Sequence, residues 1–355
     1  MLRFRTEAGT SIPLPVTSDQ ASSRPQADTL VGAWLALLCA LVAAMVMIGG
    51  ATRLTDSGLS ITEWDFAKHF VPPLSRADWE AEFALYQRTT EYQLQNRGMA
   101  LAEFRTIYLW EWGHRFLGQL IGVVFALPFL GFLTAGRLRG RVLAVLGFGL
   151  LGGLQGFVGW WMVTSGLYGR LDVSSVRLAI HLAVAFAIVG YGFWLALDAF
   201  GVPRGRGGPS RRWIAALAVL IYIQVVFGAL VAGSDAGRVF NDWPTINHQW
   251  APSNYGEFSP GWTNLTENLV AVQFHHRVLG YTVLVATLTL AWFWRPASGT
   301  GRTAAFWTGA IVMAQVVLGV ITLLLGAPLW VSLLHQAVAV ALWLSVLFWA
   351  RTVRQ

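Results

Sequence analysis

The sequence is poor in charged residues and in cysteine. Only 12% of its 355 residues are charged and 55% are hydrophobic, which excludes an ordinary soluble protein and predicts an integral membrane protein. The net charge of +7 is therefore no sign of nucleic-acid binding, and we expect no such partner. Cys39 is the only cysteine, so an intramolecular disulfide and a thiolate metal cluster are excluded. We expect Cys39 to be a small buried side chain.

Eight apolar segments have about the 20 residues that a membrane-spanning helix needs. They lie near residues 31–52, 115–135, 142–164, 178–199, 213–233, 276–294, 303–325 and 330–350. The sequence therefore predicts an all-α integral membrane protein with eight transmembrane helices. Residues 1–28 are polar and rich in Pro and Ser, so we expect a disordered cytoplasmic tail rather than a cleaved signal peptide.

Arginines set the expected orientation. They crowd three of the short links and the C-terminus, at Arg137, Arg139, Arg141, Arg204, Arg206, Arg211, Arg212, Arg295, Arg302, Arg351 and Arg354. The positive-inside rule makes this side cytoplasmic, so both termini are expected there. The long connections 53–111 and 234–274 then face outward, and their aromatic residues suggest that they fold against the membrane surface.

The two halves of the chain repeat the same motifs in the same order. The first contains GGATRLTDSG (49–58), HRFLG (114–118), QGFVG (155–159) and His181; the second contains GALVAGSDAG (228–237), HRVLG (276–280), QVVLG (315–319) and His335. Four helices are an even number, so we expect two parallel four-helix repeats related by a pseudo-twofold axis along the membrane normal. The expected boundaries are 29–200 for the N-terminal half, 201–212 for a cytoplasmic linker and 213–355 for the C-terminal half.

Four histidines occupy equivalent places in the two halves. They are His114, His181, His276 and His335, expected in the first turns of helices two, four, six and eight near the outer face. Buried imidazoles need partners, and a haem iron accepts one axial nitrogen from each side. The pattern favours two haem sites, one in each half. One zinc or iron ion held by all four histidines is the alternative, and it would require the two halves to converge.

Each HR motif also carries an arginine and a glycine. Gly118 and Gly280 follow the histidine by four residues, where a missing side chain leaves room for a flat ring. Close helix packing is the alternative, because GQLIG at 118–122 is a GxxxG pattern that also permits a homo-oligomer. Arg115 and Arg277 are expected to pair with haem propionates, unless they extend to lipid headgroups.

The halves differ at one position with consequences for chemistry. Aligning the HR motifs places Glu111 opposite Gln273. A carboxylate can accept a proton and an amide cannot. The difference predicts that the first half carries out a reaction and that the second carries a cofactor. The alternative is a glutamate that only pairs with Arg115 or Arg105.

Several of these segments resemble the haem A synthase family, in the form found in alphaproteobacteria and mitochondria. They are FRTIYLWEWGHR (104–115), HHRVLGY (275–281), GGATRLTDSGLSI (49–61), His181 and His335, and the resemblance runs from about residue 30 to 350. It implies an oxidoreductase of cytochrome oxidase biogenesis, which oxidises the C8 methyl group of haem O to a formyl group by successive hydroxylations and so makes haem A. Haem O synthase would supply the substrate, and the redox partner is unidentified.

The resemblance also implies roles for individual residues. His114 and His181 would bind the substrate haem, His276 and His335 a resident haem b, and Glu111 would be catalytic. Several Gram-positive members carry a cysteine pair in an outer loop, which this sequence lacks, so a relay through such a pair is not expected here.

Two other functions fit part of the pattern. A bis-histidine b-type electron carrier explains four histidines but not Glu111 opposite Gln273. A membrane transporter of parallel repeats would use intramembrane histidines for protons. Glu7 and Asp19 disfavour an acid-poor transit peptide, so we expect a multi-pass protein of the bacterial plasma membrane, surrounded by lipid, with haem sites near the periplasmic side.

Overall fold

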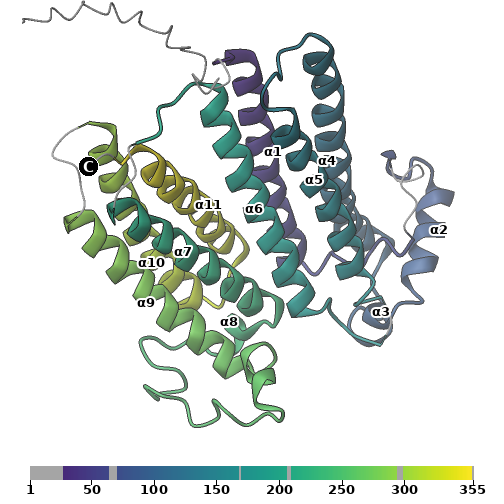
Figure 1. Ribbon diagram of the computed structural model, residues 1–355. Helices are drawn as coiled ribbons and strands as arrows, with labels where there is room; N and C mark the ends of the chain where they lie inside the picture. The colour runs from purple at the N-terminus through teal and green to yellow at the C-terminus, as the bar shows by residue number, and fades with distance from the viewer. Residues whose placement is uncertain (1–26, 64–69, 168, 206–208, 294–298, 354–355) are drawn as a thin grey trace, which may run out of the picture.

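The computed structural model describes residues 27–63, 70–167, 169–205, 209–293 and 299–353 (Figure 1). Within these ranges the chain is helical, has no β-strand, and contains eight helices long and apolar enough to cross a membrane. They are α1 (Thr29–Leu54), α4 (Leu101–Thr134), α5 (Val142–Val163), α6 (Ser175–Ala199), α7 (Pro209–Gly233), α9 (Leu269–Phe293), α10 (Thr300–Leu324) and α11 (Leu329–Thr352). The predicted all-helical fold with eight candidate membrane-spanning helices is confirmed. Almost all of the expected tail, and Arg206, Arg295 and Arg354, lie outside the described residues.

The first long connection folds into a small aromatic unit. It contains α2 (Arg76–Tyr86) and the short α3 (Thr90–Leu94). Trp79 and Tyr86 from α2 pack against Phe104 and Tyr108, which belong to the first turns of α4. The aromatic residues of this loop therefore pack on one another and on α4. The second long connection contains α8 (Ala236–Val239) and a 3-10 helix at Gly261–Leu265.

Two membrane helices begin earlier than the hydropathy pattern predicts. The sequence places their starts near residues 115 and 276, whereas α4 begins at Leu101 and α9 at Leu269. At a rise of about 1.5 Å per residue, α4 is about 51 Å long and extends past a hydrocarbon core of about 30 Å. Its projecting part carries charges that lower the local hydropathy, while the aromatic unit stabilises it from outside the helix.

The longer helices correct the predicted depth of the histidines within them. The expectation that they lie in the first turns is wrong for His114 and holds for the other three to within about two turns. His114 lies about three and a half turns after the start of α4, and His181, His276 and His335 lie about two turns into α6, α9 and α11.

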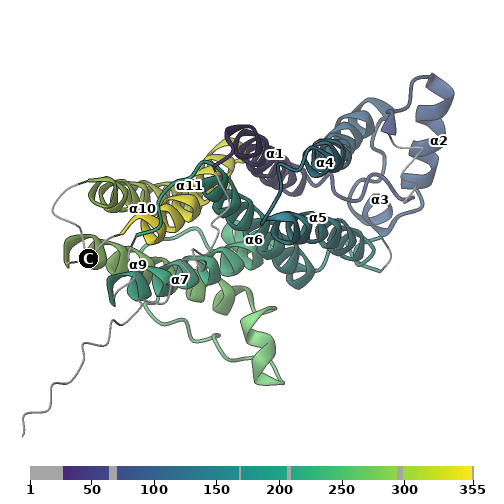
Figure 2. The same cartoon turned by 45° about the horizontal axis from the view of Figure 1, so that its top comes forward.

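The eight helices form two groups of four with the same neighbour relations. In the first group α1 and α5 each contact both α4 and α6; in the second, α7 and α10 each contact both α9 and α11. The helices that carry histidines thus share the same two neighbours in each group. Contacts of α6 with α7 and α11, and of α1 with α11, join the groups, which lie side by side in Figure 2.

Polar side chains between the groups are satisfied by backbone carbonyls. The indole N–H of Trp343 donates to the carbonyl of Phe186 at 2.9 Å, and the amide of Gln336 donates to that of Val46 at 3.0 Å. A Cβ atom on Gly190 would lie 2.7 Å from the Trp343 Nε1, so this glycine makes room for the indole. In an apolar environment each such bond removes the cost of an unpaired polar group.

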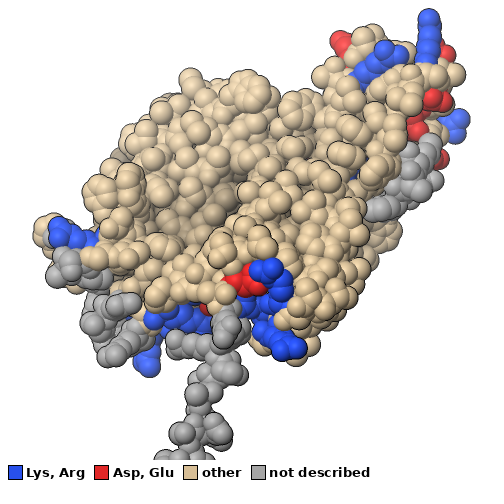
Figure 3. Space-filling model, turned by 90° about the horizontal axis from the view of Figure 1, so that it is seen from above, with Lys and Arg blue, Asp and Glu red and all other residues tan. Residues whose placement is uncertain are grey.

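An arginine joins the groups at each end of the interface. At one end Arg53, at the end of α1, pairs with Asp235 of the second half at 2.6 Å and with Asp56 at 3.0 Å. At the other end Arg351 of α11 pairs with Asp198 of α6 at 2.9 Å and is only 2% exposed. Viewed from the end where α1 begins, charged side chains gather along one edge and on a projection at the opposite corner, and the surface between them is mostly uncharged (Figure 3).

Replacing Arg351 by Met tests this interface. The change keeps an apolar chain of similar length and removes the donor to Asp198 and to the Val202 carbonyl. We expect the free energy of unfolding in mixed micelles to fall by about 2 kcal/mol, the usual worth of a hydrogen bond to a charged group. Arg212→Met, at an exposed position of α7, is the matched control. Equal stability of the two variants would contradict the assigned role.

Candidate functional site

Each of the four histidine rings lies against a glycine of a neighbouring helix. A Cβ atom added to Gly49 would lie 3.1 Å from the His114 Nε2, and one added to Gly159, Gly228 or Gly319 would lie 2.9, 3.0 or 3.0 Å from the Cε1 of His181, His276 or His335. Any larger residue would displace the ring. The glycines belong to α1, α5, α7 and α10, the helices shared as neighbours by the histidine-bearing helices.

The structure brings the histidines together in pairs within each half. His114 and His181 lie within electrostatic range of one another, and so do His276 and His335. They come from α4 and α6 in one half and from α9 and α11 in the other. These are the pairs that the sequence predicts as ligand pairs, and their role in binding iron stays a prediction.

Three glutamines contact these rings, and none of them is among the residues predicted for the site. The amide nitrogens of Gln155, Gln224 and Gln315 lie 3.3 Å from the His181 Nε2, 3.1 Å from the His276 Nδ1 and 3.3 Å from the His335 Nε2. Each glutamine precedes one of the ring-contacting glycines by four residues, one helical turn. That spacing was the available signal, visible as QGFVG and QVVLG.

The residues around the rings fit a haem. The Nδ1 atoms of His181 and His335 are buried and have no hydrogen-bond partner among the described residues. A neutral imidazole in apolar surroundings supplies the nitrogen that haem iron prefers. Two such groups from different helices, each beside a glycine, match the donor set of a bis-histidine haem.

Glu111 is buried at the junction between α4 and the loop after α1. Only 3% of the residue is exposed. Its Oε2 accepts hydrogen bonds from the Ser60 hydroxyl at 2.7 Å and from the Ile61 backbone N–H at 2.8 Å, and its Oε1 accepts one from Arg115 at 2.7 Å. The carboxylate therefore has a donor on each oxygen and a fixed orientation.

Gln273 occupies the matching position in the second half, but on one side it donates hydrogen bonds where Glu111 accepts them. Its Oε1 accepts from Arg277 at 2.7 Å, as that of Glu111 does from its arginine. Its Nε2 instead donates to the carbonyls of Ala236 and Phe240, both at 2.9 Å. The first loop thus presents donors to an acid, and the second presents acceptors to an amide.

The two arginines tie their helices to the outer loops. Arg115 donates to the carbonyl of Ile61 at 2.9 Å, and Arg277 donates to those of Phe240 at 3.2 Å and Thr245 at 2.5 Å. The alternative in which Glu111 pairs with Arg115 is thus observed, alongside the further donors to the carboxylate. Pairing of either arginine with a propionate stays a prediction.

The glycines of the HR motifs face side chains of a neighbouring helix. A Cβ atom on Gly118 would lie 3.1 Å from the Met45 Cε, and one on Gly280 would lie 3.3 Å from the Gln224 Nε2. The structure shows helix contact at both positions, as the packing alternative expects. Their place beneath a flat ring stays a prediction.

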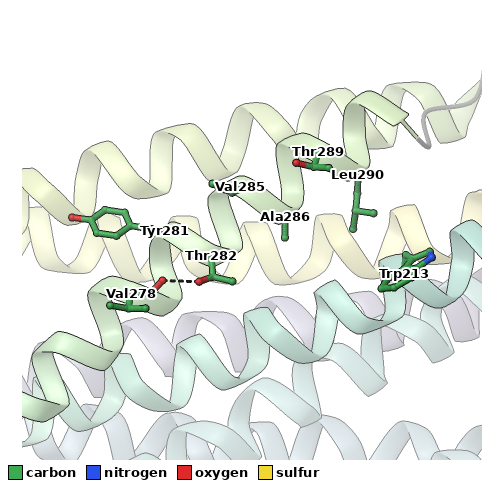
Figure 4. Close-up of a pocket in the computed structure, with 8 residues that line it drawn as sticks. All are labelled: Trp213, Val278, Tyr281, Thr282, Val285, Ala286, Thr289 and Leu290. Atoms are coloured by element: carbon green, nitrogen blue, oxygen red, sulfur yellow. Dashed lines mark hydrogen bonds between the residues drawn. The ribbon is translucent and has the colours of Figure 1, made fainter.

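A shallow groove of about 590 Å³ lies away from these residues. It runs along one face of α9 from Val278 to Leu290 and ends at Trp213 of α7 (Figure 4). Its lining is almost entirely apolar and includes none of the predicted site residues. A face of this kind suits lipid.

Glu91 of α3 is a buried carboxyl group that no motif in the sequence singles out. It is 3% exposed, and its Oε2 has no hydrogen-bond partner among the described residues. Burial raises the pKa of Glu91 to about 8, and the negative charge of Glu111 adds to the shift. Its burial depends on the packing of α3 against α2, which no local pattern reveals.

The raised pKa predicts how Glu91 affects stability. The folded chain holds the proton more tightly than the unfolded chain, so stability is highest below the ordinary glutamate pKa and falls as the pH rises towards about 8. We expect Glu91→Gln to raise the melting temperature at pH 9 and to leave it unchanged at pH 4. Glu257→Gln, at an exposed position, is the control. An equal effect of Glu91→Gln at both pH values would contradict the burial of a protonated acid.

Comparison with known proteins identifies the family. The model of the COX15-CtaA family, described as cytochrome oxidase assembly protein, matches residues 32–347. A heme A synthase of Maricaulis maris is 47% identical over 328 residues, 92% of this chain and 96% of that protein. A heme A synthase of Methylobacterium sp. is 48% identical over 90% of this chain and 91% of its own, and that of Cereibacter sphaeroides 44% over 96% and 93%. The chain belongs to the COX15-CtaA family of cytochrome oxidase assembly proteins.

Proposed function

We propose that this protein is a haem A synthase of the bacterial plasma membrane that oxidises the C8 methyl group of haem O to a formyl group by successive hydroxylations. The name shared by its relatives supports this activity. The observation that carries the proposal is the buried carboxylate of Glu111 in one half, opposite a buried amide, Gln273, in the other. A pure electron carrier has no use for that difference.

The architecture that we propose is a parallel duplication. The halves are 29–200 and 213–355, joined by a cytoplasmic linker at 201–212 and related by a pseudo-twofold axis along the membrane normal, with both termini cytoplasmic. The shared neighbour relations of the two helix groups support this arrangement. The glycine beside each histidine supports it independently.

In this proposal the first half binds the substrate. His114 and His181 hold haem O, and its isoprenoid tail remains in the surrounding lipid. Glu111 lies one turn before His114 on the same helix, so its carboxylate can accept a proton released beside the bound substrate. Arg115, Ser60 and Ile61 hold the carboxylate in place through both oxygens.

The second half carries the resident cofactor. His276 and His335 would hold haem b, and Arg277 and Gly280 would flank it. When bound, haem b supplies one-electron transfer. Gln273 completes the same helix-to-loop contact without an ionisable group, as befits a site that only holds its haem.

Replacing Glu111 by Gln tests the catalytic role. The new amide removes the proton acceptor, and conversion of haem O to haem A should fall at least about 100-fold, the lower end of general-base effects. Its nitrogen also faces a donor in either orientation of the amide, the Ile61 N–H or the Arg115 guanidinium, so the local contacts are disturbed as well. Haems extracted from purified protein and separated by chromatography give the ratio of haem A to haem O.

The control for this experiment is Ser60→Ala. It removes one hydrogen bond to Glu111 and keeps the carboxylate, so conversion should fall less than about 10-fold. Haem A production at the normal level by Glu111→Gln would refute the catalytic assignment. Equal losses in the two variants would show that loop contact, not proton transfer, is what Glu111 provides.

The resident haem is tested separately by His276→Met. We expect loss of haem b or a changed absorption spectrum, because a thioether replaces an imidazole ligand. His275→Gln is the matched control, since this neighbouring imidazole bonds to the Tyr255 hydroxyl at 2.6 Å. An unchanged bis-histidine spectrum in His276→Met would contradict the ligand assignment. Colourless wild-type protein would favour the transporter alternative.

A further inference from the structure

Gln224 contacts His276 at both its ring and its backbone. The amide Nε2 lies 3.1 Å from the His276 Nδ1 and donates to the His276 carbonyl at 2.9 Å. The Gln224 Oε1 is buried and has no partner among the described residues. One amide thus contacts this ring through its nitrogen and also has an unpaired acceptor oxygen.

Met45 occupies the corresponding place in the first half. It lies one turn before Gly49 on α1, as Gln224 lies one turn before Gly228 on α7. Those two glycines contact the rings of His114 and His276 in the two halves. The register of α1 against α4 therefore matches that of α7 against α9.

A second contact fixes the same correspondence. The Met45 Cε lies 3.1 Å from a Cβ position on Gly118, and the Gln224 Nε2 lies 3.3 Å from one on Gly280. The two glycines hold the same place in the two HR motifs. A thioether therefore lies where the second half has an amide.

His114 is the exception among the four histidines. Gln155, Gln224 and Gln315 each lie within hydrogen-bond distance of a ring nitrogen. In the part of the chain that the structure describes, no side chain forms such a bond to His114. A methionine sulfur donates no hydrogen bond and accepts only weakly, so Met45 cannot replace the missing amide.

The difference has a known effect on ligand strength. An imidazole that binds a metal through one nitrogen carries a proton on the other, and in apolar surroundings that N–H needs an acceptor. Removing such an acceptor typically weakens metal binding 10- to 100-fold. The Oε1 atoms of Gln155, Gln224 and Gln315 are unpaired, so rotation of the amide can present one of them to the ring N–H. In Gln155 and Gln224 this rotation exchanges the amide's bond to the histidine carbonyl for the bond to the ring.

We propose that Gln224 is a positioning residue that retains the haem of the second half, and that Met45 makes the haem of the first half exchangeable. The inference rests on the proposed function, in which one half must release its haem after each reaction and the other must keep it. On this inference, Met45 and Gln224, which are not haem ligands, determine that one half releases its haem and the other retains it.

Reciprocal substitutions test the pair. Purified protein saturated with ferric haem is mixed with excess apomyoglobin, and haem transfer is followed by absorbance; the wild type should show a fast and a slow phase. Met45→Gln should slow the fast phase about 10-fold, and Gln224→Met should accelerate the slow phase about 10-fold. Met47→Gln, the same change two residues along α1 and so on another face of the helix, should alter neither phase.

A spectroscopic readout separates positioning from loss of structure. The electron paramagnetic resonance g-values of ferric low-spin haem respond to ligand orientation and hydrogen bonding. Gln224→Met should shift them, and Gln224→Glu, which keeps an acceptor oxygen at the same length, should restore the slow phase at least in part. Haem-bound protein whose rates and g-values are unchanged by both swaps would overturn this inference alone. Wild-type protein that binds no haem would overturn the proposed function as well.

Discussion

Hydrocarbon offers no hydrogen bonds, so a polar side chain inside a membrane protein must find its partner within the protein. The four imidazoles meet this constraint in one way. Each lies against a glycine of a shared neighbouring helix, where the missing side chain lets the ring approach the backbone. Three of them then meet a glutamine one turn away. A glutamine and a glycine four residues apart on one helix thus provide both the hydrogen bond to the ring and the close approach of the two helices. The positions of these histidines and the packing of the bundle therefore depend on each other.

The same constraint explains why Glu111 and Gln273 are not interchangeable. Both accept a hydrogen bond from an arginine one turn later. On the other side the first loop offers the Ser60 hydroxyl and the Ile61 N–H, whereas the second offers only carbonyls. Each loop is built for its own partner, and an exchange would set donor against donor or acceptor against acceptor. The acid therefore belongs to a formed site that includes residues about 50 positions earlier in the chain.

The features that could be predicted from the sequence are those that leave a pattern within a single segment of the chain. Eight apolar runs of sufficient length indicate eight helices, and repeated HR motifs single out His114 and His276, because both signals lie within one segment. Contacts between distant segments account for the rest. The start of α4 at Leu101 depends on aromatic residues from α2, which hold a charged stretch helical. The burial of Glu91 and the contact of each glutamine with its histidine likewise require the packing of separate elements. The four-residue spacing from glutamine to glycine, in contrast, is visible in the sequence.

The two halves diverge at matched positions, and the changes point the same way. Against the glycine of its HR motif the N-terminal half has a thioether where the other half has an amide. One turn before the histidine of that motif it has an acid where the other half has an amide. One change removes a hold on the ring, and the other adds a group that can exchange a proton. A site that processes successive substrate molecules needs both a reactive group and a ligand that releases its metal. In the proposed function the second half keeps its cofactor and needs neither, which agrees with the amides of Gln224 and Gln273 at the matched positions.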